Sequence, residues 1–254
     1  MFSHRTIGIT LFSIACLTFA TGCASGGGGT ASPSPSPPAT SSPTPEPTPL
    51  ITIDNPADGA TVSVPVAMSG TANTFEASLS VDALSEAGDI LCVRNIMATS
   101  GSGTPGTWET TLAFPPQDAD MPVTLRAYEF SADDGSMVNL VEREITVSAE
   151  RPRIIIATPA CGETVVPGGT LEVTGSAFVF EAALTVELRD ASGQAVVTQN
   201  VTAADANQES PWQASLVIPA DLLGGMYDLV AFDFSAEDGS IQDEFSVQIL
   251  VVQK

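Results

Sequence analysis

One heptapeptide occurs twice in this chain, and its two copies lie about 100 residues apart. Residues 130–136 read Phe-Ser-Ala-Asp-Asp-Gly-Ser, and residues 234–240 differ from them only in having Glu237 in place of Asp133. Other landmarks recur at nearly the same interval: Phe75-Glu76-Ala77 and Phe180-Glu181-Ala182, Trp108 and Trp212, Pro56 and Pro159. A period of this length is too long for a solenoid unit and suits a tandem pair of complete domains.

Short apolar stretches separated by turn residues follow one another through both repeats, without long helical periodicity. Apolar residues that alternate with others are Leu79, Val81 and Ala83 in the first repeat and Leu184, Val186 and Leu188 in the second. Alternation with a period of two places one set of side chains inside. About seven short strands in about 100 residues is typical of an immunoglobulin-like sandwich. We therefore predict an all-β chain with two tandem immunoglobulin-like β-sandwiches, at residues 50–148 and 153–253.

Turn residues divide the later part of each repeat into four further strands. The expected strands are Ile90–Ala98, Trp108–Phe114, Val123–Phe130 and Met137–Val147, with the counterparts Ala195–Thr202, Trp212–Ile218, Tyr227–Phe234 and Ile241–Val251. Val123–Phe130 and Tyr227–Phe234 are apolar on both faces, so we expect them at the centre of a sheet. The heptapeptide at the end of each places Asp before Gly, which suits a tight hairpin turn.

The first 22 residues have the organisation of an export signal. His4 and Arg5 form a short basic start, and the mostly apolar stretch 7–19 is too short to span a membrane, which needs roughly 20 residues. Ala20-Thr21-Gly22-Cys23 resembles the bacterial lipobox, which implies cleavage at Gly22 and lipid attachment at Cys23. An ordinary signal peptide with an incidental cysteine is the alternative. Acyl chains on Cys23 would anchor the exported protein to the cell membrane without a transmembrane helix.

Residues 23–49 combine glycines at positions 26–29 with a Ser/Thr/Pro-rich run that ends at Pro49. Glycines are flexible and alternating prolines favour extended polyproline II, so we predict a disordered stalk. Its physical role would be to lift the folded part of the chain away from the membrane.

The distribution of charge and of histidine narrows the classes of function. The formal net charge is −22, and such a surface repels phosphate backbones, so we expect no nucleic acid as a partner. The only histidine, His4, lies in the segment expected to be removed. Without it the chain has neither Ser-His-Asp nor Cys-His catalysis and no zinc site with a histidine ligand. We predict no catalytic residues and no cofactor.

Acidic residues recur at matching places in the two repeats. They are Glu76, Glu129, Asp133 and Asp134 in the first, and Glu181, Asp233, Glu237 and Asp238 in the second. Their convergence at one end of each sandwich would suit calcium, which binds carboxylate and carbonyl oxygens. We favour the alternative without a metal, in which Asp134 and Asp238 shape turns while Glu76 and Glu181 accept backbone hydrogen bonds.

Glu129 and Asp233 pose a separate question, because strict alternation would place each of them on an inward face. A carboxylate there needs a partner or a β-bulge. The alternative, which we favour, is that each strand has ended before the acid, which then lies in solvent.

Two cysteines, Cys92 and Cys161, remain after the signal and the lipid site, one in each repeat. No bridge within a repeat can form, so the alternatives are a disulfide between the repeats or two free thiols, and export permits oxidation. Trp108 and Trp212 also leave two alternatives open, stacking on a sugar or packing at matched positions in the sandwich. We favour packing.

Further pairs of residues recur, and together with the Phe-Glu-Ala triplets and the heptapeptides they form a distinctive set. They are Asn55-Pro56 with Gly59 and Thr158-Pro159 with Gly162, and Ser69-Gly70 and Thr174-Gly175. This set resembles the immunoglobulin-like domain of bacterial spore germination. The resemblance covers both repeats and implies a sandwich fold and an envelope location, and it implies no catalytic residue.

These observations favour a non-catalytic envelope lipoprotein, anchored to the membrane through Cys23, that acts as a protein-binding or scaffolding module. An envelope protein is the partner that we expect. The alternative is a surface module that binds carbohydrate or peptidoglycan, with a cell-wall glycan as its partner. An enzyme would need a carboxylate pair within an apolar pocket, and the sequence indicates no such pocket.

Overall fold

The computed structural model describes residues 49–253. The predicted signal peptide (1–22), the cleavage site at Gly22, the lipid attachment at Cys23 and the stalk up to residue 48 lie outside the described residues. Both repeats belong to one compact unit, Pro47–Lys254. Between residues 49 and 253, no helix has the length and apolar character needed to cross a membrane.

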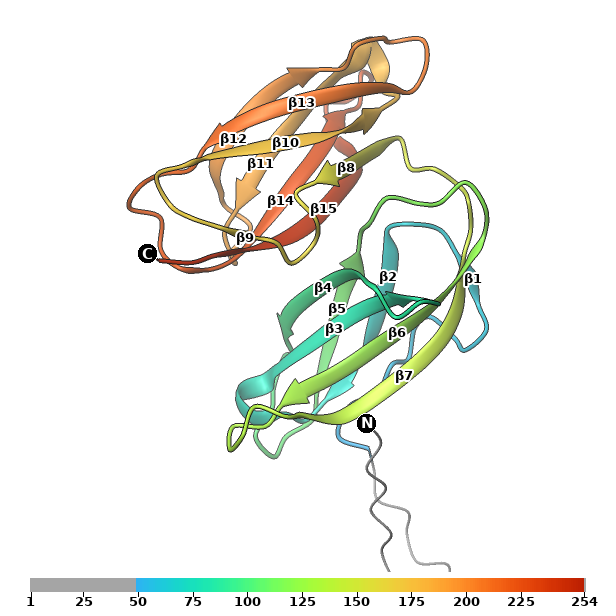
Figure 1. The fold of residues 1–254 in the computed structure, drawn as a ribbon, viewed down its shortest axis with the longest axis vertical. Coiled ribbons are helices and arrows are strands. Elements are labelled where there is room, and N and C mark those ends of the chain that lie inside the picture. The colour runs from blue at the N-terminus through green and yellow to red at the C-terminus, as the bar shows by residue number, and fades with distance from the viewer. Residues whose placement is uncertain (1–48, 254) are drawn as a thin grey trace, which may run out of the picture. The chain divides into compact units, whose positions relative to one another are not determined.

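The first repeat is a sandwich of two β-sheets (Figure 1). Its strands are β1 (Thr61–Val62), β2 (Val66–Ala72), β3 (Ser78–Ser85), β4 (Ile90–Met97), β5 (Gly106–Leu112), β6 (Met121–Phe130) and β7 (Met137–Val147). The larger sheet has the order β1-β7-β6-β3-β4, and the smaller one pairs β2 with β5. β6 therefore lies at the centre of the larger sheet, as its apolar character predicts.

The second repeat has the same plan, with one additional strand in its smaller sheet (Figure 1). Its strands are β8 (Ile154–Thr158), β9 (Thr164–Val165), β10 (Thr170–Ala177), β11 (Ala183–Arg189), β12 (Ala195–Thr202), β13 (Ser210–Val217), β14 (Gly225–Phe234) and β15 (Ile241–Val251). The sheets have the orders β12-β11-β14-β15-β9 and β13-β10-β8, so β14 is central as predicted. The prediction of two tandem immunoglobulin-like sandwiches is confirmed.

Each tryptophan packs against a glycine on the neighbouring strand. Gly70 pairs with Trp108, and Gly175 pairs with Trp212. A Cβ on Gly70 would lie 2.9 Å from Trp108 Cζ2 and 2.0 Å from Thr52 O, and a Cβ on Gly175 would lie 2.7 Å from Trp212 Cζ2. Such close approach excludes a side chain, which explains why glycine recurs at both places. Both tryptophans are buried, so packing is their role and stacking on a sugar is wrong.

Three predicted strands, β7, β12 and β15, have the bounds that the sequence indicates. β5 and β13 differ, because each begins two residues before its tryptophan and ends before the expected Phe114 or Ile218. The reason is the pairing of the tryptophan with its glycine, which continues for two residues on the amino-terminal side. The tryptophans thus lie inside their strands and not at the beginning.

The Phe-Glu-Ala triplets form short 3-10 turns, η1 (Phe75–Ala77) and η2 (Phe180–Ala182), immediately before β3 and β11. Glu76 and Ala77 have φ angles of 52° and 60°, and the two equivalent residues of the second repeat have 54° and 55°. Residues other than glycine rarely adopt such values. Both repeats therefore retain the same uncommon backbone conformation at the same end of the sandwich.

The repeated heptapeptide forms the turn between β6 and β7, and again between β14 and β15. In the first repeat, Asp134 Oδ1 accepts hydrogen bonds from Ser136 N at 3.0 Å and from Ser136 Oγ at 2.7 Å. Asp238 accepts the same pair from Ser240 at 3.0 and 2.8 Å. These bonds lower the pKa of both carboxyl groups. Asp134 and Asp238 therefore shape turns, as the favoured interpretation predicts.

Candidate functional site

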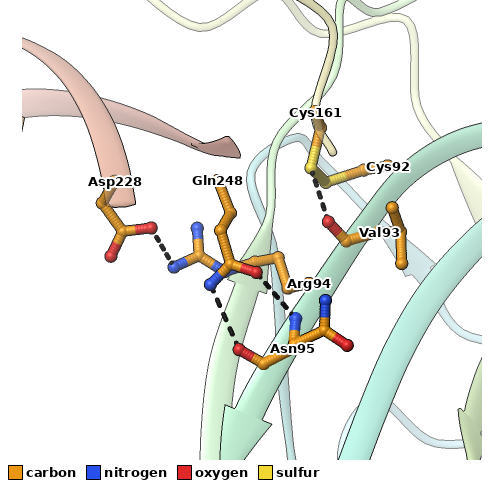
Figure 2. The surroundings of a disulfide bond; sticks show 7 residues. All are labelled: Cys92, Val93, Arg94, Asn95, Cys161, Asp228 and Gln248. Carbon is orange, nitrogen blue, oxygen red and sulfur yellow. Dashed lines mark hydrogen bonds and ion pairs between the residues drawn. A yellow bond between two sulfur atoms is a disulfide. The ribbon is translucent and has the colours of Figure 1, made fainter. Parts of the chain in front are cut away.

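The two repeats are joined by a disulfide between Cys92 and Cys161 (Figure 2). Cys92 is buried on β4, the edge strand of the larger sheet in the first repeat, and Cys161 lies in the loop between β8 and β9. Of the two alternatives that the sequence leaves open, the structure contains the bridge. Cys161 Sγ also lies 3.2 Å from Val93 O. Because a bonded sulfur carries no hydrogen, this is a close contact and not a hydrogen bond.

Beside the disulfide, β4 meets polar side chains of the second repeat (Figure 2). Asn95 N donates to Gln248 Oε1 at 2.7 Å, and Gln248 Nε2 donates to Asn95 O at 3.1 Å. Arg94 Nη2 donates to Asp228 Oδ1 at 2.6 Å. The amide of Gln248 thus satisfies both main-chain groups of Asn95, as a neighbouring strand would. The second repeat therefore closes part of an edge that would otherwise be free to pair with another chain.

A groove of about 1200 Å³ lies at this contact and is lined by both repeats. Its charged lining residues are Arg94, Glu109, Asp190, Asp228 and Glu244, and its methionines are Met68, Met97 and Met226. Arg94 is already paired with Asp228. The groove therefore presents a mostly acidic and partly apolar surface, which suits binding of a cationic or neutral group.

Asp82 on β3 is fully buried, although alternation along the strand would place it on the outer face of the sheet. Arg126 donates to its carboxylate through Nε at 2.8 Å and Nη2 at 2.6 Å, and Tyr128 Oη donates to Oδ2 at 3.0 Å. Burial, with the nearby charge of Asp82, raises the pKa of Tyr128 to about 12. The hydrogen bond to Asp82 raises the pKa of Arg126. These groups satisfy one another, so the cluster stabilises the sheet and leaves no reactive group exposed.

The acidic residues considered for calcium do not come together. Within residues 49–253, no group of three or more His, Cys, Asp or Glu side chains is arranged to hold a metal ion. Glu76 and Glu181 are exposed, and in the described part of the chain no backbone hydrogen bond to either carboxylate is present. The expectation that these two glutamates accept backbone hydrogen bonds is therefore wrong. In the first repeat Glu129 has that role instead.

The favoured expectation that the strands end before Glu129 and Asp233 is wrong for both. β6 and β14 run one residue beyond these acids, and a register shift just before each acid marks a β-bulge in the pairing with β7 or β15. The bulge lets a carboxylate turn toward the end of the sandwich within a continuing strand. Both residues instead fit the other alternative, in which the acid lies within the strand beside a β-bulge.

The carboxylates of Glu129 and Asp233 differ in the number of hydrogen bonds that they accept. Glu129 is half-buried and accepts hydrogen bonds from Phe75 N at 3.2 Å and from Asn139 Nδ2 at 2.5 Å. Asp233 is only 2% exposed and accepts one from Gln242 Nε2 at 3.2 Å, while its Oδ1 has no partner among residues 49–253. Burial raises the pKa of Asp233. One carboxylate oxygen of Asp233 is therefore buried and unpaired.

Three matched positions hold exposed large apolar side chains in each repeat, at the end that carries the heptapeptide turn. The first end patch consists of Phe75, Phe130 and Met137, and the second end patch consists of Phe180, Phe234 and Ile241. Phe75 and Phe180 are 64% and 63% exposed, and Phe130 and Phe234 are 57% and 51% exposed. Within each patch the strand residue pairs across the hairpin with Met137 or Ile241. The same three positions are therefore apolar and exposed in both repeats.

Sequence reasoning missed the end patches because it treated their phenylalanines only as landmarks of the repeat. Alternation alone cannot distinguish an exposed aromatic residue from a buried one at the end of a strand. A usable signal was present, since large apolar residues lie directly on both sides of a polar turn in each repeat. A residue beside a hairpin turn has fewer neighbours than one in the middle of a strand, so it is less completely covered.

Among proteins with curated descriptions, none matches this chain. Solved structures do match it, at 15% identity. The fibronectin(III)-like modules of Clostridium thermocellum CbhA match over 80% of this chain and 94% of theirs, with a TM-score of 0.27. The ICAM-5 D1–D4 ectodomain fragment and the BSP domain of a biofilm associated protein match over 80% of this chain and over 53% and 29% of theirs, with TM-scores of 0.28 and 0.22. TM-scores this low support no conclusion about this chain, so its family is assigned from the family model.

The family model of the immunoglobulin-like domain of bacterial spore germination matches two stretches, residues 50–136 and 153–240. Each match ends with the last residue of a heptapeptide, and together the matches cover more than half of the chain. The matched stretches coincide with the two sandwiches except for their final strands, β7 and β15. The chain therefore belongs to the family of the immunoglobulin-like domain of bacterial spore germination, and it carries this domain twice in tandem.

Proposed function

We propose that the protein is a non-catalytic protein-binding or scaffolding module of the cell envelope, held at the membrane through a lipid on Cys23. Immunoglobulin-like domains are typically non-catalytic modules, and function in such domains resides in particular surfaces and not in the fold. The observation that carries the proposal is the pair of end patches. Large aromatic side chains that remain exposed at matched positions of two repeats are typical of surfaces that bind other proteins.

The surroundings of the end patches favour a particular kind of partner. Asp133 and Asp134 are exposed beside the first patch, and Glu237 and Asp238 are exposed beside the second. A binding surface with an apolar centre and an acidic rim is complementary to a protein that presents apolar side chains surrounded by lysine or arginine. Because the patch occurs twice, one chain can engage two such sites, which raises the overall affinity when both are reached.

Crosslinking in native cells, followed by identification of the captured protein, tests this role. The test variant replaces the exposed aromatics of both patches with serine, at Phe75, Phe130, Phe180 and Phe234. The control is Leu223→Ser, which removes an apolar side chain that is 77% exposed and lies outside the patches. We expect the wild type and the control to capture the same envelope protein and the test variant to lose it. Equal capture by the test variant would contradict the proposal.

The position of the anchor has its own test. The Cys23→Ser variant should appear in the soluble fraction of the envelope, because no acyl chain then holds it to the membrane. Wild-type protein should fractionate with membranes. If both fractionate alike, the proposed anchor is wrong. Retention of the protein on purified cell wall, unchanged by the aromatic substitutions, would instead favour carbohydrate binding.

A further inference from the structure

β4 and β12 are equivalent strands at equivalent edges of the two larger sheets. Each has eight residues, each lies at the end of its sheet, and each pairs only with the preceding strand, β3 or β11. Their registers also correspond, since Asn95 pairs with Ser80 as Asn200 pairs with Thr185. The main-chain groups of Asn95 point away from β3, because both bind Gln248. By the same register, the main-chain groups of Asn200 point away from β11.

The outer edge of β12 is not closed in the way that the edge of β4 is. Within residues 49–253, no backbone hydrogen bond beyond the ladder with β11 involves residues 195–202, and no side chain binds the main chain of Asn200 or Thr198. Thr198 lies two residues before Asn200, so its main-chain groups point the same way. β12 therefore presents the row of unpaired donors and acceptors that an added strand can satisfy.

The composition of β12 lacks the charges and prolines that commonly protect an exposed edge. Residues 195–202 read Ala-Val-Val-Thr-Gln-Asn-Val-Thr, with no charge, no proline and no glycine. Charged residues, prolines and bulges are the usual means of preventing unwanted pairing along an edge. β4, whose edge is covered at Asn95 by Gln248, carries the charged Arg94. A register shift marks a bulge at the start of β12, so the regular part of the edge is residues 197–202. This uncharged and uncovered stretch is suited to pairing with another chain.

The charges at the two ends of β12 indicate which chain fits. Asp190 precedes the strand and Asp205 follows it, and hydrogen bonds from Ser192 and Asn207 lower the pKa of these two carboxyl groups. A second copy of β12 added in antiparallel orientation would bring each of these acids near an acid of the other copy. With a net charge of −22 on each chain, such self-pairing is opposed by repulsion. A strand with basic residues at both ends is complementary instead.

We propose that β12 binds an extended segment of a partner protein, which adds to the sheet as a strand with an uncharged centre and lysine or arginine at its ends. This inference rests on the proposed protein-binding function and specifies how a partner is held. The edge continues into the second end patch, because Ala203 N donates to Ala182 O at 2.8 Å, two residues from the exposed Phe180. A segment that extends beyond β12 therefore reaches an apolar contact.

Amide hydrogen exchange in the oxidised, isotope-labelled protein tests the proposal with defined peptides. The probe is a peptide of alternating threonine and valine with two lysines at each end. One control has glutamates in place of the lysines, and another is the lysine peptide with alternate main-chain nitrogens methylated. We expect the lysine peptide to slow exchange at Thr198 and Asn200 and the glutamate peptide to bind about tenfold more weakly. The methylated peptide should give no protection, since it lacks the donors that β12 requires.

The lysine peptide should leave the exchange of Asn95 unchanged, because Gln248 already occupies that edge. A Thr198→Lys variant, which places a charge on the edge without affecting the core, should reduce binding of the lysine peptide. Absence of protection at Thr198 and Asn200, or equal binding of the methylated peptide, overturns the proposal. If the peptide gives no protection but the aromatic variant still loses its crosslinked partner, strand addition at β12 is overturned and the proposed protein-binding function stands. Unchanged crosslinking in that variant would overturn the proposed function.

Discussion

Glu129 in the first repeat and Asp233 in the second follow the same β-bulge on the same central strand, yet their surroundings differ. Glu129 reaches the main chain of Phe75 and so links β6 to the turn before β3. Asp233 is one methylene shorter, and within residues 49–253 no hydrogen bond joins it to the corresponding turn. The two repeats thus share a backbone conformation at this position but not the hydrogen bonds of the acidic side chain. Two differences separate the networks: the acid is one methylene shorter, and Asp243, an acceptor, stands where Asn139 donates to Glu129 in the first repeat.

The outer faces of the larger sheets show a second difference. In the first repeat the fully buried Asp82 binds Arg126 and Tyr128. In the second repeat Glu187 takes the place of Asp82 and binds Arg189 at 2.8 Å, and that guanidinium lies 5.0 Å from the ring centre of Phe232. An ion pair above an aromatic ring covers the sheet in both cases. Only the first repeat, however, buries the carboxylate completely.

Removal of the disulfide is expected to cause the largest loss of stability, because the bond makes the two repeats unfold together. The bond closes a stretch of 69 residues, and loop entropy then corresponds to about 4 kcal/mol of stabilisation. In the Cys92→Ala/Cys161→Ala variant we expect lower stability and separate unfolding of the repeats. Urea unfolding measures this in Trp108→Phe and Trp212→Phe backgrounds, where the remaining tryptophan reports on one repeat.

Reduced wild-type protein is the control for this variant, and it should unfold in the same way. If the two tryptophans report coincident transitions with and without the bond, the repeats are coupled by other contacts. Asn95 with Gln248 and Arg94 with Asp228 would then be sufficient to join them.

A smaller but still large effect is expected at Asp82. The Asp82→Ala substitution leaves Arg126 and Tyr128 without their shared partner in a covered position, and loss of one member of a buried ion pair costs about 3 kcal/mol. The matched substitution Glu187→Ala affects a partly exposed pair and should cost about 1 kcal/mol or less. Urea unfolding of the two variants measures both values. Equal losses would contradict the distinction between the two outer faces.

Substitution of Asp233, in contrast, is expected to raise the stability of the protein. Burial raises the pKa of Asp233, so its contribution to stability is present below the unfolded pKa and is lost as the pH rises through the folded pKa. The Asp233→Asn substitution removes this loss, and we expect it to raise stability near neutral pH by about 1 kcal/mol. The gain should disappear in acid. Thermal unfolding from pH 3 to pH 7 tests this, and a variant that is less stable throughout would contradict it.

A loss of stability of about the same size is expected at Tyr128. Its pKa of about 12 means that the favourable interaction is fully present below the unfolded value near 10 and is lost as the pH rises toward 12. The Tyr128→Phe substitution should cost about 1 kcal/mol at neutral pH, for the lost hydrogen bond to Asp82. Spectrophotometric titration should show one tyrosine, absent from this variant, that ionises only near pH 12. Ionisation of Tyr128 near pH 10 would contradict its burial.

Much of the fold could be predicted from the sequence because the chain contains its own comparison. The interval between Trp108 and Trp212, together with the repeated heptapeptide, establishes two domains, and turn residues on both sides of β7, β12 and β15 locate these strands. The turn role of Asp134 also follows from local chemistry. Each of these features depends on residues that are close together in the sequence.

The parts that could not be predicted depend on residues that are distant in the sequence. Asp82 is buried because Arg126 and Tyr128 cover it from another strand, and Asn95 is paired because Gln248 reaches it from the other repeat. The exposure of the end patches likewise depends on how many elements meet at that end. A pattern of alternation specifies which way a side chain points, but it does not specify what lies opposite.

The second repeat closes the edge of β4 at Asn95, while the equivalent edge of β12 stays open at Asn200. Amide hydrogen exchange of Asn95 and Asn200 in the oxidised protein tests it most directly, because the two residues occupy the same position in the two sheets. We predict slow exchange at Asn95, whose amide binds Gln248, and fast exchange at Asn200. In the Gln248→Ala variant, exchange at Asn95 should become as fast as at Asn200. Equal protection of the two amides in the wild-type protein would contradict the claim.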